Sequence, residues 1–195
     1  MENKSHTVGI HRLAVLSVSL AAAMVLSYVE YLVPISTAVP GIKIGLANLV
    51  VIFLLYRLGL PAAAAVSMTR VVLSNLLFGS LPGMAYSLAG AVLSLSVMAL
   101  FRRIRFFSEV GVSVLGAVFH NLGQILVACF MMEQAAVFYY LPVLCLTGTV
   151  AGIVIGILAA VLVRKVPDFD RTGKKPQKAE TGSGADQTDK EDSAI

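Results

Sequence analysis

The sequence predicts an all-α membrane protein whose six transmembrane helices form one compact bundle with both termini in the cytoplasm. Hydrophobic residues make up 57% of the 195-residue chain and charged residues only 13%, whereas a soluble domain carries about 25% charged residues. The mean hydropathy is +0.85. Six apolar runs follow one another along the chain, and most basic residues fall on one side of them. The net charge of +4 does not indicate nucleic-acid binding, because membrane topology accounts for basic residues beside apolar runs.

The first apolar run, residues 13–33, follows a short polar N-terminus, residues 1–12, which we expect in the cytoplasm. About 20 apolar residues are enough to cross a bilayer, so this run is long enough to span it. It is also longer than the ~7–15 residue core of a signal peptide, which disfavours a cleaved leader. A loop with two prolines, residues 34–43, leads to the second run, residues 44–56. This run is short for a span unless loop residues extend it.

The four later runs are bounded by turn signals or by basic residues. The third run carries Arg70 near its middle, and an arginine-rich loop follows the fourth. The fifth run contains the sequence GAVFHNLGQ, and the sixth ends at Arg164 and Lys165. A polar tail closes the chain, and its composition predicts a disordered cytoplasmic segment. The four runs are residues 62–78, 83–101, 110–132 and 137–163, the six-helix membrane domain is residues 13–165, and the tail is residues 166–195.

The distribution of lysine and arginine predicts the orientation. With six spans, one side of the membrane receives both termini and the turns after the second and fourth runs. The basic residues on that side are Lys4, Arg12, Arg57, Arg102, Arg103, Arg105, Arg164 and Lys165. The opposite side receives only Lys43. Because basic residues near spans favour the cytoplasm, we expect a multi-pass protein of a bacterial-type cell membrane with both termini inside.

The stretch GAVFHNLGQ, residues 116–124, places three polar side chains inside an otherwise apolar run. The spacing of His120, Asn121 and Gln124 puts them on one broad face of a helix. Polar side chains at membrane depth are costly unless they meet partners, water or a ligand. Other runs contribute polar residues to the same outer half, which predicts a substrate-binding cavity open to the outside. The candidate residues are Arg70, Asn75, His120, Asn121, Gln124, Glu30, Lys43, Asn48 and Tyr86.

Arg70 is the strongest single signal, and two interpretations of it stay open. A charged residue deep in a span faces the protein interior, where Arg70 either forms a structural ion pair with Glu30 or contacts a ligand. Arg70, Lys43 and His120 outnumber Glu30, which favours an anionic ligand. His120 is either a hydrogen-bonded core residue or a ligand contact, and a proton-relay role is less favoured. A metal site is disfavoured, because no second His or Cys stands at ligand spacing.

Small residues recur at four-residue spacing in two of the runs. In the sixth run the glycine series from Gly148 to Gly156 predicts close helix packing. In the first run Ser19, Ala23 and Ser27 fit either internal packing or a docking face for another membrane subunit. The sequence does not separate these two interpretations.

Four sequence blocks together resemble one protein family. They are GIKIGLANLV (41–50), RVVLSNLLFG (70–79), YSLAGAVLSLSVM (86–98) and GVSVLGAVFHNLGQ (111–124). Over residues 10–165 the chain resembles the Gx transporter family, also labelled heptaprenyl diphosphate synthase component I. More distantly, it resembles the substrate-binding S components of energy-coupling-factor (ECF) transporters. That resemblance implies a six-helix protein that binds small molecules from outside and works with a transmembrane coupling subunit and two cytoplasmic ATPases.

The sequence argues against catalysis by this chain. Prenyl-chain synthases need clustered aspartates to hold Mg²⁺ and diphosphate, and the predicted membrane domain has no such cluster. There is no GxxxxGK[ST] nucleotide-binding loop, so ATP use requires a partner, and no cofactor is expected. The leading hypothesis is a small-molecule uptake transporter or its substrate-binding membrane subunit, with unknown substrate. The alternatives are a non-catalytic accessory subunit that associates with a prenyl synthase subunit, and an ion-coupled carrier that works alone.

Overall fold

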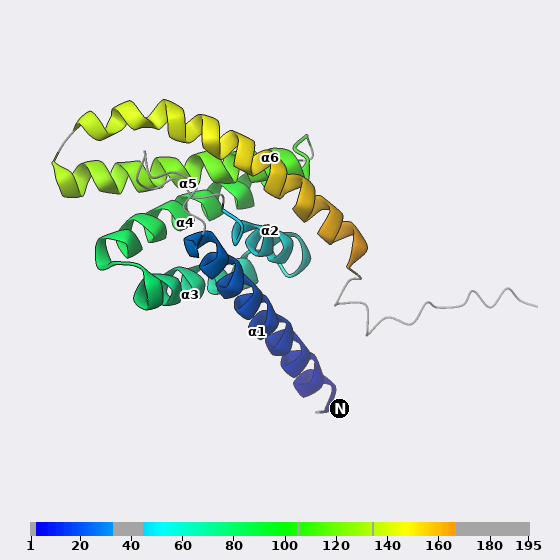
Figure 1. Cartoon of the computed structure of the whole chain (residues 1–195). Coiled ribbons are helices and arrows are strands. Elements are labelled where there is room, and N and C mark those ends of the chain that lie inside the picture. Colours follow the sequence, from blue (N-terminus) through cyan, green and yellow to red (C-terminus); the bar gives the residue numbers. More distant parts are fainter. Residues whose placement is uncertain (1–2, 33–44, 105, 134, 167–195) are drawn as a thin grey trace, which may run out of the picture.

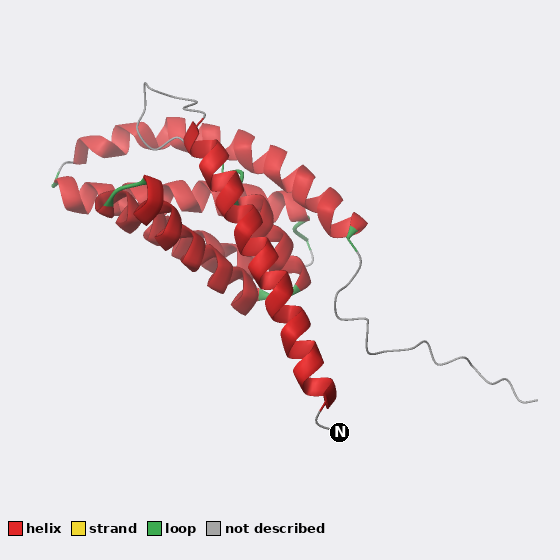
Figure 2. Ribbon diagram, turned by 60° about the horizontal axis from the view of Figure 1, so that its bottom comes forward, coloured by secondary structure: helices red, strands yellow, loops and turns green. Residues whose placement is uncertain are grey.

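The computed structural model describes residues 3–32, 45–104, 106–133 and 135–166. Within these residues every regular element is helical, as the sequence predicts (Figures 1 and 2). The predicted loop 34–43, including Lys43, and the predicted tail from residue 167 lie outside the described residues. The elements are α1 (Asn3–Leu32), α2 (Asn48–Arg57), α3 (Leu60–Phe78), α4 (Leu81–Arg102), α5 (Glu109–Met132), the 3₁₀ helix η1 (Ala135–Tyr140) and α6 (Leu141–Lys165).

Five helices are long and apolar enough to cross a membrane. They are Arg12–Leu32, Leu60–Phe78, Leu81–Arg102, Glu109–Met132 and Phe138–Lys165. The second predicted run differs, because α2 has only 10 residues and is therefore about 15 Å long. A bilayer core is about 30 Å thick, so α2 alone does not cross it. The expectation of six full spans is not confirmed, whereas the other five apolar runs do form helices of spanning length.

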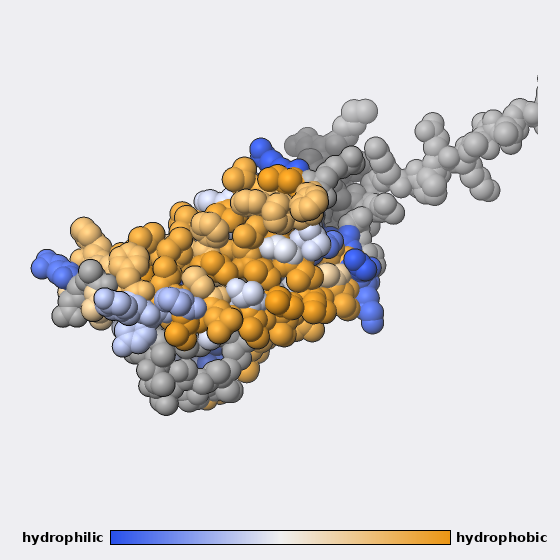
Figure 3. Space-filling view, turned by 90° about the horizontal axis from the view of Figure 1, so that it is seen from above, coloured by the Kyte–Doolittle hydropathy of each residue, from blue (hydrophilic) through white to orange (hydrophobic). Residues whose placement is uncertain are grey.

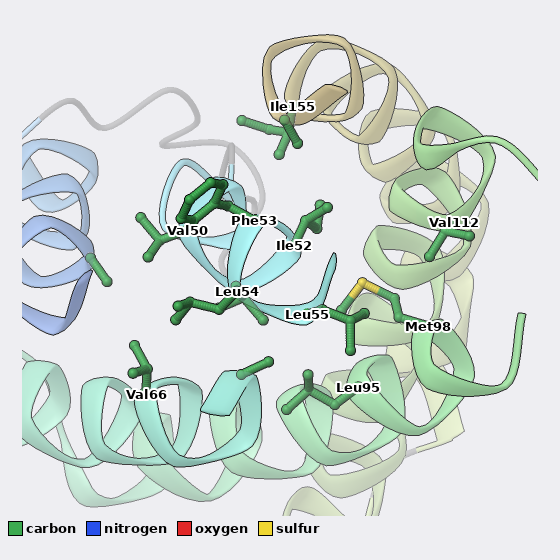
Figure 4. Close-up of a cluster of buried hydrophobic side chains, with 14 residues drawn as sticks. Val50, Ile52, Phe53, Leu54, Leu55, Val66, Leu95, Met98, Val112 and Ile155 are labelled. Carbon is green, nitrogen blue, oxygen red and sulfur yellow. The ribbon is translucent and has the colours of Figure 1, made fainter. Parts of the chain in front are cut away.

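α2 lies at the centre of the bundle. Its six consecutive residues from Val50 to Leu55 are all buried, and Leu54 and Leu55 are 0% exposed. Figure 4 shows side chains of the neighbouring helices around α2, among them Val66 and Met98. A helix that is apolar on every face is either buried in a protein core or spans a membrane, and the central residues of α2 are covered by other helices. α2 is therefore a short core helix, and its burial holds the other helices around it.

Glycines bring α5 close to its two neighbours, α4 and α6. A Cβ atom on Gly152 of α6 would lie 2.7 Å from Val114 Cα, and one on Gly156 would lie 2.8 Å from Val110 Cα. On the other side, a Cβ on Gly123 would lie 2.9 Å from the carbonyl oxygen of Ala89 in α4. These distances confirm the close packing that the glycine series of the sixth run predicts, and they fix α5 between α4 and α6.

We expect Gly152→Leu to destabilise the protein, because the new side chain meets the backbone of α5 and not a flexible side chain. Overpacking of this kind costs about 1–3 kcal/mol, or a fall of at least about 2 °C in the unfolding temperature for a chain of this size. Thermal unfolding of the purified protein in lipid nanodiscs measures this. Val150→Leu is the matched control, since Val150 is 57% exposed on the same helix. Equal unfolding temperatures for the two variants would contradict the close α5–α6 contact.

Both ends of the described chain lie at the same end of the bundle, which we call the terminal end (Figures 1 and 2). Three arginines there donate hydrogen bonds to backbone carbonyls. Arg57 donates to the carbonyl oxygens of Val163 and Val166, near the end of α6. Arg12 donates to the carbonyl oxygen of Leu58, just after α2, and Arg102 donates to that of Tyr56, near the end of α2. Both distances are 3.3 Å. These contacts satisfy free carbonyls and complement the negative ends of the helix dipoles.

The surface of the bundle is largely apolar. In Figure 3, hydrophobic residues cover most of the visible face, and the most hydrophilic described residues gather towards its two ends. Exposed side chains such as Val18 (71%), Leu146 (68%) and Leu76 (65%) lie on helices of spanning length. An apolar surface of this extent fits a lipid environment, in which such side chains remain uncovered by protein.

Candidate functional site

A polar cavity lies between α1, α3, α5, α6 and the start of α2. It contains about 470 Å³ of space between atoms, including the part that opens at the surface. We call it the polar cavity. Its lining residues are Glu30, Gly45, Asn48, Arg70, Ala117, His120, Asn121, Gln124, Gly148 and Ala151.

Six of the nine residues predicted for the site line this cavity, although they come from four separate helices. These six are Glu30, Asn48, Arg70, His120, Asn121 and Gln124. Two of the others, Asn75 and Tyr86, are described but do not line it, and Lys43 lies outside the described residues. The amide of Asn75 donates instead to the carbonyl oxygen of Val71 in its own helix, at 2.8 Å.

Arg70 is held at one edge of the polar cavity and retains an unused donor. Its Nη1 donates to Ser27 Oγ of α1 at 3.2 Å. Its Nε is buried and has no hydrogen-bond partner in the described part of the chain. A buried charged donor without an acceptor is destabilising. The free N–H of this guanidinium is therefore suited to donate a hydrogen bond to a ligand in the cavity.

Glu30 is engaged elsewhere. Its Oε1 accepts a hydrogen bond of 2.5 Å from the backbone N–H of Gly45, just before α2. Among the described residues, no hydrogen bond or ion pair joins Glu30 to Arg70. Glu30 nevertheless acts on Arg70 electrostatically, so both interpretations of Arg70 that the sequence leaves open remain predictions.

The N-terminus of α2 faces the polar cavity. Asn48 is the first residue of α2 and Gly45 precedes it by three positions, and both line the cavity. Backbone N–H groups at a helix N-terminus carry a partial positive charge that favours anions. Glu30 accepts from the N–H of Gly45 in the turn before the helix, and the N–H of Asn48 donates to the carbonyl oxygen of Gly45 at 2.8 Å. Arg70 and the helix end contribute positive charge to this part of the cavity, and Glu30 is the one acidic residue among its described lining residues.

The polar residues of α5 are positioned by contacts with glycines on both sides. Asn121 Nδ2 donates to the carbonyl oxygen of Leu144 at 2.7 Å, and a Cβ on Gly148 would approach the same nitrogen to 2.6 Å. A Cβ on Gly90 of α4 would lie 3.0 Å from both His120 Cε1 and Gln124 Cγ. These glycines therefore let α4 and α6 set the positions of the three polar side chains.

Four lining residues were not among the predicted site residues. They are Gly45, Ala117, Gly148 and Ala151. None has a polar side chain, so no chemical signal marks them in the sequence. The four-residue spacing that includes Gly148 indicates only helix packing, although that packing is also what brings α6 to the cavity wall.

The five helices of spanning length, their apolar surface and the polar cavity between them indicate a multi-pass membrane protein. The sequence matches the family model described as heptaprenyl diphosphate synthase component I over residues 20–162. The chain belongs to this family, which is also the Gx transporter family. Neither a curated protein nor a solved structure matches the sequence.

Proposed function

We propose that this protein is the substrate-binding membrane subunit of a small-molecule uptake transporter and that its ligand carries an anionic group. The observation that carries this proposal is the polar cavity. It gathers six polar or charged side chains from four helices inside a membrane domain, and it contains a buried guanidinium nitrogen without a partner. Such residues are expensive in a bilayer and mark substrate pathways.

The chemistry of the lining supports an anionic ligand. Arginine presents a planar set of donors that matches a carboxylate or a phosphate in two parallel hydrogen bonds. Arg70 uses one donor on Ser27 and leaves Nε without a partner among the described residues. The first turn of α2 adds partial positive charge nearby. Asn121 and Gln124 supply polar groups that orient a ligand.

The charge distribution supports an orientation with both termini in the cytoplasm of a cell membrane. The terminal end holds the described basic residues of the loops and helix ends, among them Arg12, Arg57 and Arg102. The described residues of the opposite end, which we call the distal end, include no lysine or arginine. Because basic residues favour the cytoplasmic side, the ligand would reach the cavity through the distal end, from outside.

This orientation predicts a labelling pattern in intact cells. In a background without Cys129 and Cys145, Ser80→Cys in the α3–α4 turn should react with a membrane-impermeant maleimide. Arg103→Cys, at the end of α4, should react only after the cells are permeabilised. Both positions are exposed. A difference in labelling therefore reports the side of the membrane and not burial within the protein. The reverse pattern would contradict the orientation.

ATP-driven transport requires partners, because the sequence has no nucleotide-binding loop. The resemblance to ECF S components implies a transmembrane coupling subunit and two ATPases. The family description supports a second function, a non-catalytic accessory subunit of a prenyl synthase. The polar cavity favours transport over this alternative, since a membrane anchor for a cytoplasmic enzyme does not need a ligand cavity.

A mild-detergent pull-down from native membranes, followed by mass spectrometry, separates these functions. Recovery of a coupling subunit with ATPases is the result that the transporter proposal predicts. Recovery of a prenyl synthase subunit without ATPases would contradict it and support the accessory function. A matched pull-down of an unrelated multi-pass protein with the same tag identifies background binders.

A further inference from the structure

The described walls of the polar cavity carry no large apolar side chain. Four of the lining residues are glycine or alanine, and the other six are polar or charged. Small-molecule sites are usually lined by hydrophobic and aromatic side chains, which bind the apolar parts of a ligand by removing them from water. The described lining of this cavity therefore fits a ligand that is hydrophilic throughout and not one that carries a hydrocarbon chain.

The polar cavity is also small. Of the space between its atoms, about 50 Å³ is wide enough to admit the centre of a water-sized group. One water molecule needs about 10–15 Å³, so the cavity holds on the order of five such groups. A carboxylate, with its three non-hydrogen atoms, leaves room for a second polar group. A phosphate group, with five, fills the space by itself.

Two carboxamide side chains of the lining make no hydrogen bond to another described residue. They belong to Asn48 and Gln124. The third carboxamide differs, because Asn121 Nδ2 donates to the carbonyl oxygen of Leu144. Each carboxamide has both a donor and an acceptor, and leaving such a group without a partner away from water is costly. Asn48 and Gln124 are therefore suited to a ligand group that both donates and accepts, and a hydroxyl is the smallest such group.

Gln124 lies where a ligand held by Arg70 can reach it. Arg70 stands eight residues before the end of α3 at Phe78, and Gln124 stands eight residues before the end of α5 at Met132. Both helices end at the distal end, so each residue is about 12 Å along its helix from that end. α4 packs against both helices, and a Cβ on its Gly90 would lie 3.0 Å from Gln124 Cγ. This contact fixes the base of the Gln124 side chain and leaves its carboxamide to the cavity.

We infer that the ligand is a short carboxylic acid that carries a hydroxyl group, with the carboxylate at Arg70 and the hydroxyl at the carboxamides of Gln124 and Asn48. This inference rests on the proposed function and adds a substrate class to it. It makes Gln124 a specificity-determining residue. An analogue with a methyl group in place of the hydroxyl leaves the carboxamides unpaired, and sites built to bind a hydroxyl reject such analogues for this reason.

Gln124→Met is the variant that tests this role. Methionine has a similar length and shape but lacks the donor and the acceptor of the carboxamide. Leu126→Met is the matched control, since Leu126 lies on the same helix and is 48% exposed. Thermal unfolding of each variant establishes that it is folded, and the wild type alone already tests whether the site distinguishes a hydroxyl from a methyl group.

The experiment is a calorimetric titration of the full chain in nanodiscs with acetate, glycolate and propionate. Glycolate and propionate have the same charge and nearly the same size, and differ only in a hydroxyl against a methyl group. For the wild type and Leu126→Met we expect glycolate to bind about tenfold more tightly than propionate or better. For Gln124→Met we expect the ratio of the two affinities to fall to about threefold or less.

Four outcomes would overturn the inference, and they separate it from the proposed function. Binding of acetate with equal affinity for glycolate and propionate would reject the hydroxyl subsite and leave the anionic site standing. Tighter binding of propionate than of glycolate would indicate an apolar subsite instead. An unchanged ratio in folded Gln124→Met would remove Gln124 from the recognition of the hydroxyl. Binding of none of the three acids by folded wild-type protein would reject the anionic site and the inference together.

Discussion

Replacing Arg70 with methionine is expected to weaken the binding of small anions by about 100-fold or more. The variant removes the guanidinium but keeps an unbranched apolar side chain of similar length. Loss of one partner from a buried, charge-assisted contact costs about 2–5 kcal/mol. Isothermal titration of acetate and methyl phosphate into nanodisc-embedded protein measures the effect, with their neutral counterparts acetamide and methanol as ligand controls.

Two matched variants make this result specific to the cavity. Arg70→Lys keeps the charge but loses the planar pair of donors, so we expect an intermediate affinity. Arg103→Met removes an exposed arginine at the terminal end and should bind anions as the wild type does. Retention of full anion affinity in Arg70→Met, or selective binding of cations by the wild type, would contradict the assignment of an anionic ligand to Arg70.

Replacing Leu54 with alanine is expected to destabilise the protein by about 2–5 kcal/mol. Leu54 is 0% exposed at the centre of α2, and truncating such a side chain removes buried area and leaves a cavity. Because α2 contacts α1, α3 and α6, the loss loosens the interior of the whole bundle. Urea-dependent or thermal unfolding in nanodiscs, followed by circular dichroism, measures it.

The control for this prediction is Leu146→Ala, the same change at a side chain that is 68% exposed on α6. We expect lipid to contact this position, so its truncation should alter stability by less than about 1 kcal/mol. If α2 were a lipid-facing span and not a core helix, the two variants would behave alike. Equal unfolding free energies would therefore reject the central position of α2.

The arrangement of α2 shows what apolar patterning does and does not predict. Hydropathy correctly places helices in all six apolar runs, because each must satisfy its backbone internally in lipid. It does not distinguish a short span from a helix buried on every side, since both are apolar all round. Residues 44–56 look like a weak span for this reason. The difference lies in the contacts of Val50 to Leu55 with other helices, which no local pattern reports.

For the candidate site, too, the sequence pattern predicts some features and misses others. Polar residues in apolar runs point to the cavity, because the bilayer leaves them few other environments. Asn75 does not line it, and helix geometry explains why: it stands five residues after Arg70, which is about 140° around the helix. Tyr86 lies one turn nearer the distal end than Gly90, the residue of α4 that contacts His120 and Gln124.

The central claim is that Arg70 holds an anionic small molecule in the polar cavity. Native mass spectrometry of the wild type and of Arg70→Met, purified in parallel from the same host membranes, tests it most directly. We predict that a small anion remains bound to a substantial fraction of the wild-type protein and is absent from the variant, while both proteins show the same secondary structure by circular dichroism. Equal occupancy of the two proteins, or a bound species that is neutral or cationic, would contradict the claim.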